Sequence, residues 1–119
     1  MASILVLDDV LDAVNLIKRI LGRLPHKVNV FTEEEEALAF AGKNSIDLAI
    51  MDIKLKKMSG VEVLEELKKT NPAMRAIMIT GYPTMETARA SLKLGANDYC
   101  VKPIDNDELE QKVIDALGY

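Results

Sequence analysis

Residues 3–9 of the chain read SILVLDD, an apolar run that ends in two aspartates. An apolar run without polar interruptions is typical of a β-strand that is covered on both faces, as the strands of parallel sheets are. Similar short runs follow at residues 28–31, 48–51, 76–79 and 99–101, and longer stretches with helical spacing separate them. The alternation predicts five βα units in one doubly wound α/β sandwich, whose parallel strands take the order 2-1-3-4-5.

Capping residues indicate where the helices begin and end. We expect helices over residues 11–24, 32–41, 61–67, 84–94 and 106–117. Thr32 and Glu35 have the spacing of a capping box at the start of the second helix. Gly95 is placed to cap the end of the fourth helix, and Asn106 to cap the start of the fifth. The complete arrangement is a flavodoxin-like (βα)5 fold.

The composition fits one folded domain, which we place at residues 1–119. Hydrophobic residues make up 49% of the chain, which is enough for a core and argues against intrinsic disorder. The single cysteine excludes an intrachain disulfide and a cysteine-based zinc site. The single histidine excludes any mechanism that needs two.

Charge and hydropathy limit the classes of binding partner and the cellular location that we expect. The chain has 15 Lys and Arg against 19 Asp and Glu, a formal net charge of −4. An acidic balance argues against direct nucleic-acid binding, which needs a basic surface. The first apolar run has no basic flank and is too short for a signal peptide or a membrane span. We therefore expect a cytoplasmic protein that binds neither nucleic acid nor membrane.

Polar residues stand at the ends of four of the five expected strands. Asp8 and Asp9 follow the first strand, Asp52 the third, Thr80 the fourth and Lys102 the fifth. In an open parallel sheet, ligands bind beyond the carboxyl ends of the strands. We therefore expect these five side chains to form one site.

Three carboxylates in one site repel one another, so a cation must offset their charge. Lys102 supplies one positive charge, and a divalent cation can supply the rest. Because all the available ligands are hard oxygens, Mg²⁺ or Mn²⁺ fits far better than zinc. Asp52 is the best candidate for a nucleophile that forms an acyl phosphate, with the Thr80 hydroxyl on a phosphoryl oxygen.

These positions, with residues 80–88, TGYPTMETA, and 94–103, LGANDYCVKP, resemble the response-regulator receiver domains of two-component signalling. The resemblance covers essentially the whole chain and is greatest to receivers of enhancer-binding transcription activators. It implies that a sensor histidine kinase or a phosphotransfer protein donates a phosphoryl group to Asp52. The modified domain would then control an output domain or a partner protein.

The resemblance also implies residue roles at the metal site. Asp8, Asp9 and Asp52 are similar to the acidic metal ligands of the family, and the backbone carbonyl of Lys54 to a further ligand. The domain would catalyse its own phosphorylation and dephosphorylation, so it is not an enzyme with a separate turnover substrate.

A second group of roles concerns switching. Thr80 and Tyr99 resemble the family's switch residues, Lys102 its catalytic lysine, and the Lys102–Pro103 peptide bond one that is usually cis. The face built from the fourth helix, the fifth strand and the fifth helix would change its partner preference. A monomer, or a homodimer formed on phosphorylation, is expected.

The chain departs from the family pattern around the phosphoacceptor. Val10 stands where many members carry a third acid, and Leu55-Lys56 replaces the usual Met-Pro. Lys54 and Tyr82 each stand two residues beyond a site residue, at positions that line the path of the hydrolytic water in the family. A long lysine and a bulky tyrosine there are expected to slow loss of the phosphoryl group.

Three other functions are compatible with the same architecture. A Mg²⁺-dependent phosphatase with an aspartyl nucleophile would need a second Asp two residues after Asp52, where Lys54 stands. A flavin-binding module would need a Ser/Thr/Gly-rich phosphate loop after the first strand, where Asp8 and Asp9 repel a phosphate. A receiver-like module that no longer uses phosphate would act through protein interactions alone.

Overall fold

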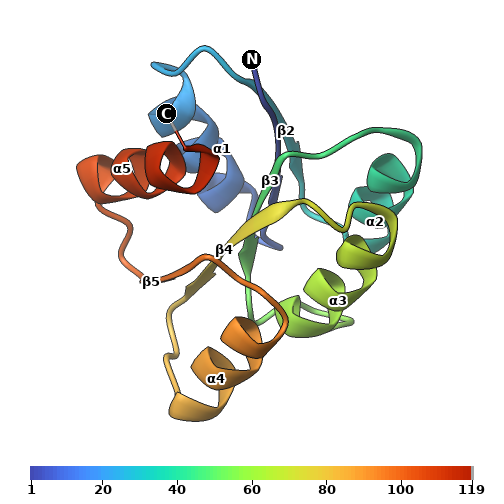
Figure 1. The fold of residues 1–119 in the computed structure, drawn as a ribbon. Helices are drawn as coiled ribbons and strands as arrows, with labels where there is room; N and C mark the ends of the chain where they lie inside the picture. The colour runs from blue at the N-terminus through green and yellow to red at the C-terminus, as the bar shows by residue number, and fades with distance from the viewer. Residues whose placement is uncertain (119) are drawn as a thin grey trace.

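The computed structural model describes residues 1–118, which form a five-stranded parallel sheet with helices on both faces (Figure 1). The strands are β1 (Ser3–Leu7), β2 (Lys27–Phe31), β3 (Leu48–Asp52), β4 (Arg75–Thr80) and β5 (Asp98–Val101). The helices are α1 (Leu11–Leu21), α2 (Glu34–Lys43), α3 (Gly60–Thr70), α4 (Met85–Lys93) and α5 (Asn106–Leu117). The strand order is β2-β1-β3-β4-β5 with parallel neighbours, so the predicted flavodoxin-like fold is confirmed.

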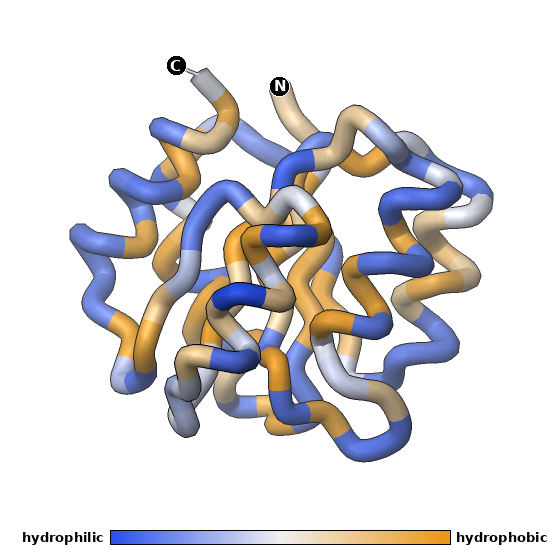
Figure 2. Tube along the Cα trace, turned by 60° about the horizontal axis from the view of Figure 1, so that its bottom comes forward, coloured by the Kyte–Doolittle hydropathy of each residue, from blue (hydrophilic) through white to orange (hydrophobic). Residues whose placement is uncertain are grey.

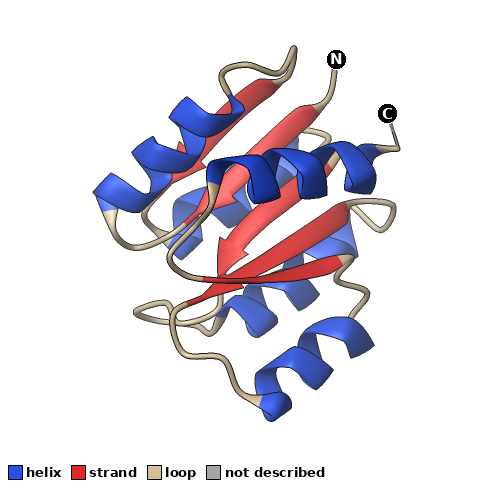
Figure 3. Ribbon diagram, turned by 90° about the vertical axis from the view of Figure 1, so that its left-hand side faces the viewer, coloured by secondary structure: helices blue, strands red, loops and turns tan. Residues whose placement is uncertain are grey.

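Two hydrophobic cores lie on the two faces of the sheet. α1 and α5 cover one face, in front of the strands in Figure 3, and their apolar side chains pack against it. α2 and α3 pack against the other face. The hydrophobic residues follow the strands and the inner sides of the helices, and the outer turns are hydrophilic (Figure 2). Within residues 1–118, no helix is long and apolar enough to cross a membrane.

β3 shows how one strand serves both cores. All of its residues are buried. Leu48 and Ile50 pack in the core with α1 and α5, and Ala49 and Met51 pack in the core with α2 and α3. Side chains alternate along a strand, so an unbroken apolar run is what a strand between two cores requires. At its carboxyl end, β3 delivers Asp52 to the edge of the sheet.

The predicted start of α2 is wrong in detail. The helix begins at Glu34, and its N-cap Glu33 makes no side-chain capping hydrogen bond, so Thr32 and Glu35 form no capping box. In a capping box the glutamate reaches back to the N-cap amide. Glu35 instead pairs with Lys57, whose Nζ lies 2.8 Å from its carboxylate. The Glu35 side chain therefore contacts the β3–α3 loop rather than the backbone at the start of its own helix.

Two further helix ends differ from the prediction. α5 is capped by the Asp105 carboxylate, which accepts a hydrogen bond from the Glu108 amide, and not by Asn106. Asp and Asn cap helices about equally well, so the sequence alone does not decide between these neighbours. α1 ends at Leu21 rather than Leu24. Leu24 lies in a turn but still packs against the core, which explains why the apolar spacing extended the predicted helix.

Two glycines stand where another residue would be strained, one because of its φ angle and one because of a close contact. Gly95 follows α4 with a φ of 90°, the left-handed region that favours glycine, and ends the helix as predicted. Gly60 begins α3 against the end of β3, where a Cβ would overlap the Asp52 carbonyl oxygen and lie 2.8 Å from the Ile53 Cα. Its amide donates a hydrogen bond to the Ile53 carbonyl at 2.6 Å. Gly60 therefore lets α3 start directly against the strand end that carries Asp52.

Replacing Gly60 by alanine should force these backbone segments apart. We expect Gly60→Ala to lower the free energy of unfolding by about 3 kcal/mol, as overpacking of a tight site does. Gly42→Ala is the matched control, because Gly42 is exposed in α2 and nothing beyond its own helix lies within 4 Å of a Cβ there. Alanine at this position should be neutral or add up to about 1 kcal/mol. Urea unfolding measures both, and equal stabilities would contradict the close approach.

Candidate functional site

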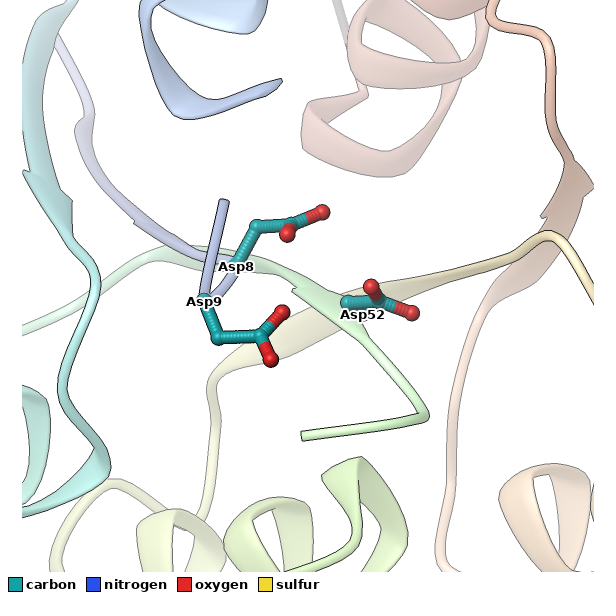
Figure 4. Close-up of side chains that lie close together, drawn as sticks. All are labelled: Asp8, Asp9 and Asp52. Carbon is teal, nitrogen blue, oxygen red and sulfur yellow. The ribbon is translucent and has the colours of Figure 1, made fainter. Parts of the chain in front are cut away.

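Three aspartates meet at the carboxyl ends of β1 and β3. These strands are neighbours with Leu7 paired to Met51, so the residues that follow β1 lie beside the end of β3. Asp8, Asp9 and Asp52 each offer a carboxylate oxygen, and these oxygens lie within 4.8 Å of one another (Figure 4). Asp8 and Asp52 are buried and Asp9 is half-buried. The structure therefore brings together the acidic residues that the strand ends predicted.

Lys102 carries the positive charge of the site. It follows β5, and its Nζ lies 2.9 Å from Asp8 Oδ2 and 3.0 Å from Asp52 Oδ2. Partial burial lowers the pKa of Lys102, but its hydrogen bonds to the two carboxylates outweigh burial and hold the pKa above its usual value. The ammonium is therefore charged at neutral pH. The peptide bond from Lys102 to Pro103 is cis.

The surroundings of the Asp52 carboxylate shift its pKa in opposite directions. Burial raises the pKa of Asp52, and the negative charge of Asp8 raises it further. Hydrogen bonds from Lys102 and from the Lys54 amide, at 3.2 Å, lower the pKa but do not outweigh burial. The net pKa lies above its usual value, so a further positive charge beside the ionised carboxylate would be favourable.

The backbone orients both buried aspartates. The Val10 amide donates a hydrogen bond to Asp8 Oδ1 at 3.0 Å, and the Lys54 amide donates to Asp52 Oδ1 at 3.2 Å. Each is the local turn in which an aspartate accepts from the amide two residues further on. Lys102 takes the other oxygen of each carboxylate. Both carboxylates are therefore fixed in direction as well as in place.

Thr80 and Tyr99 lie at the other side of the site. Thr80 is buried at the end of β4, and its hydroxyl oxygen accepts a hydrogen bond from the Tyr82 amide at 3.0 Å. Tyr99 is half-buried on β5, and its hydroxyl lies 3.2 Å from that of Thr87, where either group can donate. Thr87 is not among the residues that the strand-end pattern indicates. Its only signal is its place three residues after Thr84, the N-cap of α4.

A cavity of about 330 Å³ lies between the loops that follow β3 and β4. Its lining includes Lys54, Thr80, Tyr82 and Thr87. The Lys54 ammonium lies over the Tyr82 ring, 4.4 Å from its centroid, which is a cation–π contact. The two loops are therefore joined by a side-chain contact beside Thr80.

Glu34 is a buried charged residue that no sequence pattern indicated. It is 1% exposed, and its Oε2 accepts hydrogen bonds from the amides of Lys57 and Met58 at 2.7 and 3.0 Å. These amides belong to the loop that carries Lys54. A run of glutamates such as residues 33–36 is ordinarily a solvated helix start, so the sequence holds no sign of which one turns inward.

The side chains gathered at this site suit one class of reaction. Asp52 places a carboxylate, a group that can act as a nucleophile, beside the Lys102 ammonium, and Thr80 offers a hydroxyl. Asp8 and Asp9 add carboxylate oxygens, the ligands that Mg²⁺ and Mn²⁺ prefer. Together these groups match the requirements of phosphoryl transfer, in which charge spreads over the phosphoryl oxygens.

Comparison with known proteins gives the family. The family described as the response regulator receiver domain matches residues 4–114. The chain is 33% identical over 117 residues to the transcriptional regulatory protein ZraR of Escherichia coli (strain K12), and 37% identical over 109 residues to a putative response regulator, NtrX-like, of Rickettsia bellii. These alignments cover 98% and 90% of this chain but 26% and 23% of those proteins. The chain thus spans about a quarter of the length of these curated relatives.

Solved structures agree with this assignment. A response regulator receiver domain protein (CheY-like) from Methanospirillum hungatei JF-1 superposes with a TM-score of 0.94 at 35% identity, over 99% of this chain and 94% of that one. NtrX from Brucella abortus, in complex with ATP, superposes with a TM-score of 0.90 at 33% identity, over 98% of this chain and 27% of that one. The chain therefore belongs to the family of response regulator receiver domains, which act in phosphorelay signalling and not as enzymes with a separate turnover substrate.

Proposed function

We propose that this domain accepts a phosphoryl group on Asp52 from the phosphohistidine of a sensor histidine kinase or a phosphotransfer protein, in a reaction that depends on Mg²⁺. The observation that carries the proposal is the Asp52 carboxylate, which is buried, bonded to Lys102 and within 4.8 Å of two other carboxylates. The domain supplies the catalytic groups itself. It therefore catalyses its own phosphorylation and dephosphorylation.

The charges of the site support a divalent cation. Asp8, Asp9 and Asp52 contribute −3 and Lys102 contributes +1, which leaves −2 for one divalent ion to neutralise. The three carboxylates and the backbone carbonyl of Lys54 would hold Mg²⁺, and Mn²⁺ has the same ligand preference. When bound, the ion neutralises charge on the transferring phosphoryl group.

The chain's own groups account for the rest of the transfer. An Asp52 oxygen attacks phosphorus, the O–P bond forms as the P–N bond to histidine breaks, and the histidine nitrogen keeps the electron pair of that bond. The Lys102 ammonium, which lies 3.0 Å from Asp52 Oδ2, stays beside the phosphoryl oxygens. The Thr80 hydroxyl turns from the Tyr82 amide to one of these oxygens.

The turn of Thr80 is the proposed switch. It would open space beside the cavity and let Tyr99 turn inward, away from its contact with Thr87 at the start of α4. The two arrangements are states of one equilibrium, whose populations phosphorylation shifts. The face of α4, β5 and α5 would report this shift to an output domain or a partner protein. Its apolar side chains that are exposed for such contacts are Met85, Leu92 and Val101.

The cellular setting is part of the same proposal. Residues 1–119 would act as one receiver domain in the cytoplasm, as a monomer or as a homodimer formed on phosphorylation. ZraR is by name a transcriptional regulatory protein, which supports control of transcription through an output domain. This domain itself would contact neither nucleic acid nor membrane.

Phosphorylation can be tested with a small phosphodonor. Incubation of the wild type with acetyl phosphate and Mg²⁺ should add one phosphoryl group, measured by intact-mass spectrometry. Chelation of Mg²⁺ should abolish the gain, and so should Asp52→Asn, which removes the nucleophile. Asp12→Asn, at an exposed aspartate of α1, is the matched control and should be phosphorylated like the wild type. A folded wild type that gains nothing would leave an interaction module that does not use phosphate.

Removal of the Asp52 charge should stabilise the metal-free domain. The pKa of Asp52 is raised in the folded state, so its contribution to stability is present below the unfolded pKa and is lost as pH rises through the folded pKa. At pH ~7 in EDTA, Asp52→Asn should therefore raise the urea midpoint, and the gain should vanish below the usual aspartate pKa of about 4. A lower midpoint than the wild type at neutral pH would contradict the raised pKa.

The contact between Lys54 and Tyr82 should slow loss of the phosphoryl group. Lys54→Ala keeps the backbone groups of residue 54 but opens the path of the attacking water. We expect a phosphoryl half-life shorter by about threefold or more, equivalent to ~0.7 kcal/mol in the barrier. Lys56→Ala, an exposed lysine of the same loop, is the control. Mass spectrometry over time measures the decay, and a fast wild-type decay that Lys54→Ala leaves unchanged would rule out this role.

A further inference from the structure

Glu34 is the one charged side chain that residues 1–118 bury outside the aspartate cluster. It is the first residue of α2, and its neighbours Glu35 and Glu36 are exposed. Burial raises the pKa of Glu34, but hydrogen bonds from backbone amides and the positive charge of Lys57 outweigh it and hold the pKa below its usual value. The buried side chain is therefore an anion at neutral pH.

The Glu34 carboxylate holds a loop that is distant in sequence. Its Oε2 accepts hydrogen bonds from the amides of Lys57 at 2.7 Å and Met58 at 3.0 Å. The next residue, Glu35, adds the ion pair with the Lys57 side chain at 2.8 Å. Hydrogen bonds to an ionised acceptor are about twice as strong as neutral ones. The start of α2 therefore restrains the tip of the β3–α3 loop.

The site depends on this loop. It leaves β3 at Asp52, and the Lys54 amide donates to the Asp52 carboxylate. An antiparallel bridge between Lys54 and Ser59, and the hydrogen bond from Gly60 to Ile53, hold the base of the loop. Glu34 adds a restraint at the tip. With base and tip both held, the Lys54 backbone, a proposed metal ligand, is kept in place.

The loop sequence explains why an outside restraint is needed. Residues 53–59 read IKLKKMS, so this loop holds no proline. A proline would fix its own φ and so stiffen the loop. Without one, the loop keeps that freedom. Glu34 restrains the same loop from a different element.

Stability of α2 alone does not explain the burial of Glu34. Its second oxygen, Oε1, is buried and has no hydrogen-bond partner among the described residues. Leaving a buried polar group unpaired costs about 1–3 kcal/mol. An exposed acid such as Glu36 interacts favourably with the helix dipole without that cost. The hydrogen bonds that the Glu34 carboxylate accepts from the β3–α3 loop therefore explain its burial better than an interaction with the dipole of α2 does.

We propose that Glu34 is a positioning residue for the metal and phosphoacceptor site. It orders the β3–α3 loop, and through the loop it keeps the Lys54 backbone in place for Mg²⁺. This inference rests on the proposed function. It requires that the order of the loop and the affinity for Mg²⁺ be coupled thermodynamically.

The first test is Mg²⁺ affinity, measured by isothermal titration calorimetry on the full chain. Glu34→Ala should weaken Mg²⁺ binding about tenfold, as loss of an outer-shell partner does. Glu34→Gln, which keeps an acceptor but loses the charge, should lie between this variant and the wild type. Glu36→Ala removes the same charge from the same helical turn without touching the loop, and it should bind like the wild type.

Stability with and without Mg²⁺ separates positioning from simple support of the fold. A residue that only supports the fold lowers the urea midpoint equally in EDTA and in saturating Mg²⁺, and a positioning residue lowers it more in Mg²⁺. Glu34→Gln provides this comparison if Glu34→Ala does not fold. Equal losses with unchanged Mg²⁺ affinity would overturn the inference and leave the proposed function intact. A wild type that binds no Mg²⁺ would overturn both.

Discussion

The burial of like charges at one end of the sheet is the constraint on which the rest of the structure depends. Asp8 and Asp52 are both buried, and an ionised carboxylate is costly to bury unless it is paired. Lys102 pairs with both, at 2.9 and 3.0 Å. Because Lys102 follows β5 and Asp8 follows β1, the ammonium must reach across the ends of β4 and β3. The charge pairing therefore depends on the strand order, which brings the ends of β1, β3 and β5 within reach of one another.

Packing in the two hydrophobic cores offsets the free-energy cost of burying these charges and holds the strand ends in place. β3 is buried along its whole length, and β1 is buried from Ile4 to Leu7, so packing on both faces sets the positions of the strand ends. Pairing with Lys102 does not fully compensate the buried charge of Asp52, because the pKa of Asp52 stays above its usual value. The site thus keeps an unbalanced negative charge on a stiff support. A stiff site of this kind favours a cation without having to rearrange first.

The position of a site residue can be predicted from the sequence where the residue stands at a strand end. Asp8, Asp52 and Lys102 each stand at the end of an apolar run, so the strand order alone was enough to predict that they meet. The role of Glu34 cannot be predicted in this way, because residues 33–36 are all glutamate and have the same local preference. Only the packing of α2 against the β3–α3 loop selects which of them turns inward. Strand order can be read from local patterns, whereas a contact between a helix start and a distant loop depends on tertiary structure.

The β3–α3 loop is restrained by side chains from two different elements, and the two restraints act on different groups. Glu34 holds backbone amides at the tip of the loop, while the Lys54 side chain lies over the Tyr82 ring on the β4–α4 loop. The first acts on the backbone that would bind the metal, and the second on access to the phosphoryl group. A proline within the loop would stiffen both at once. Because Lys56 stands there instead, a change at Glu34 and a change at Lys54 would alter metal affinity and phosphoryl lifetime separately, so that each can be adjusted without loss of the other.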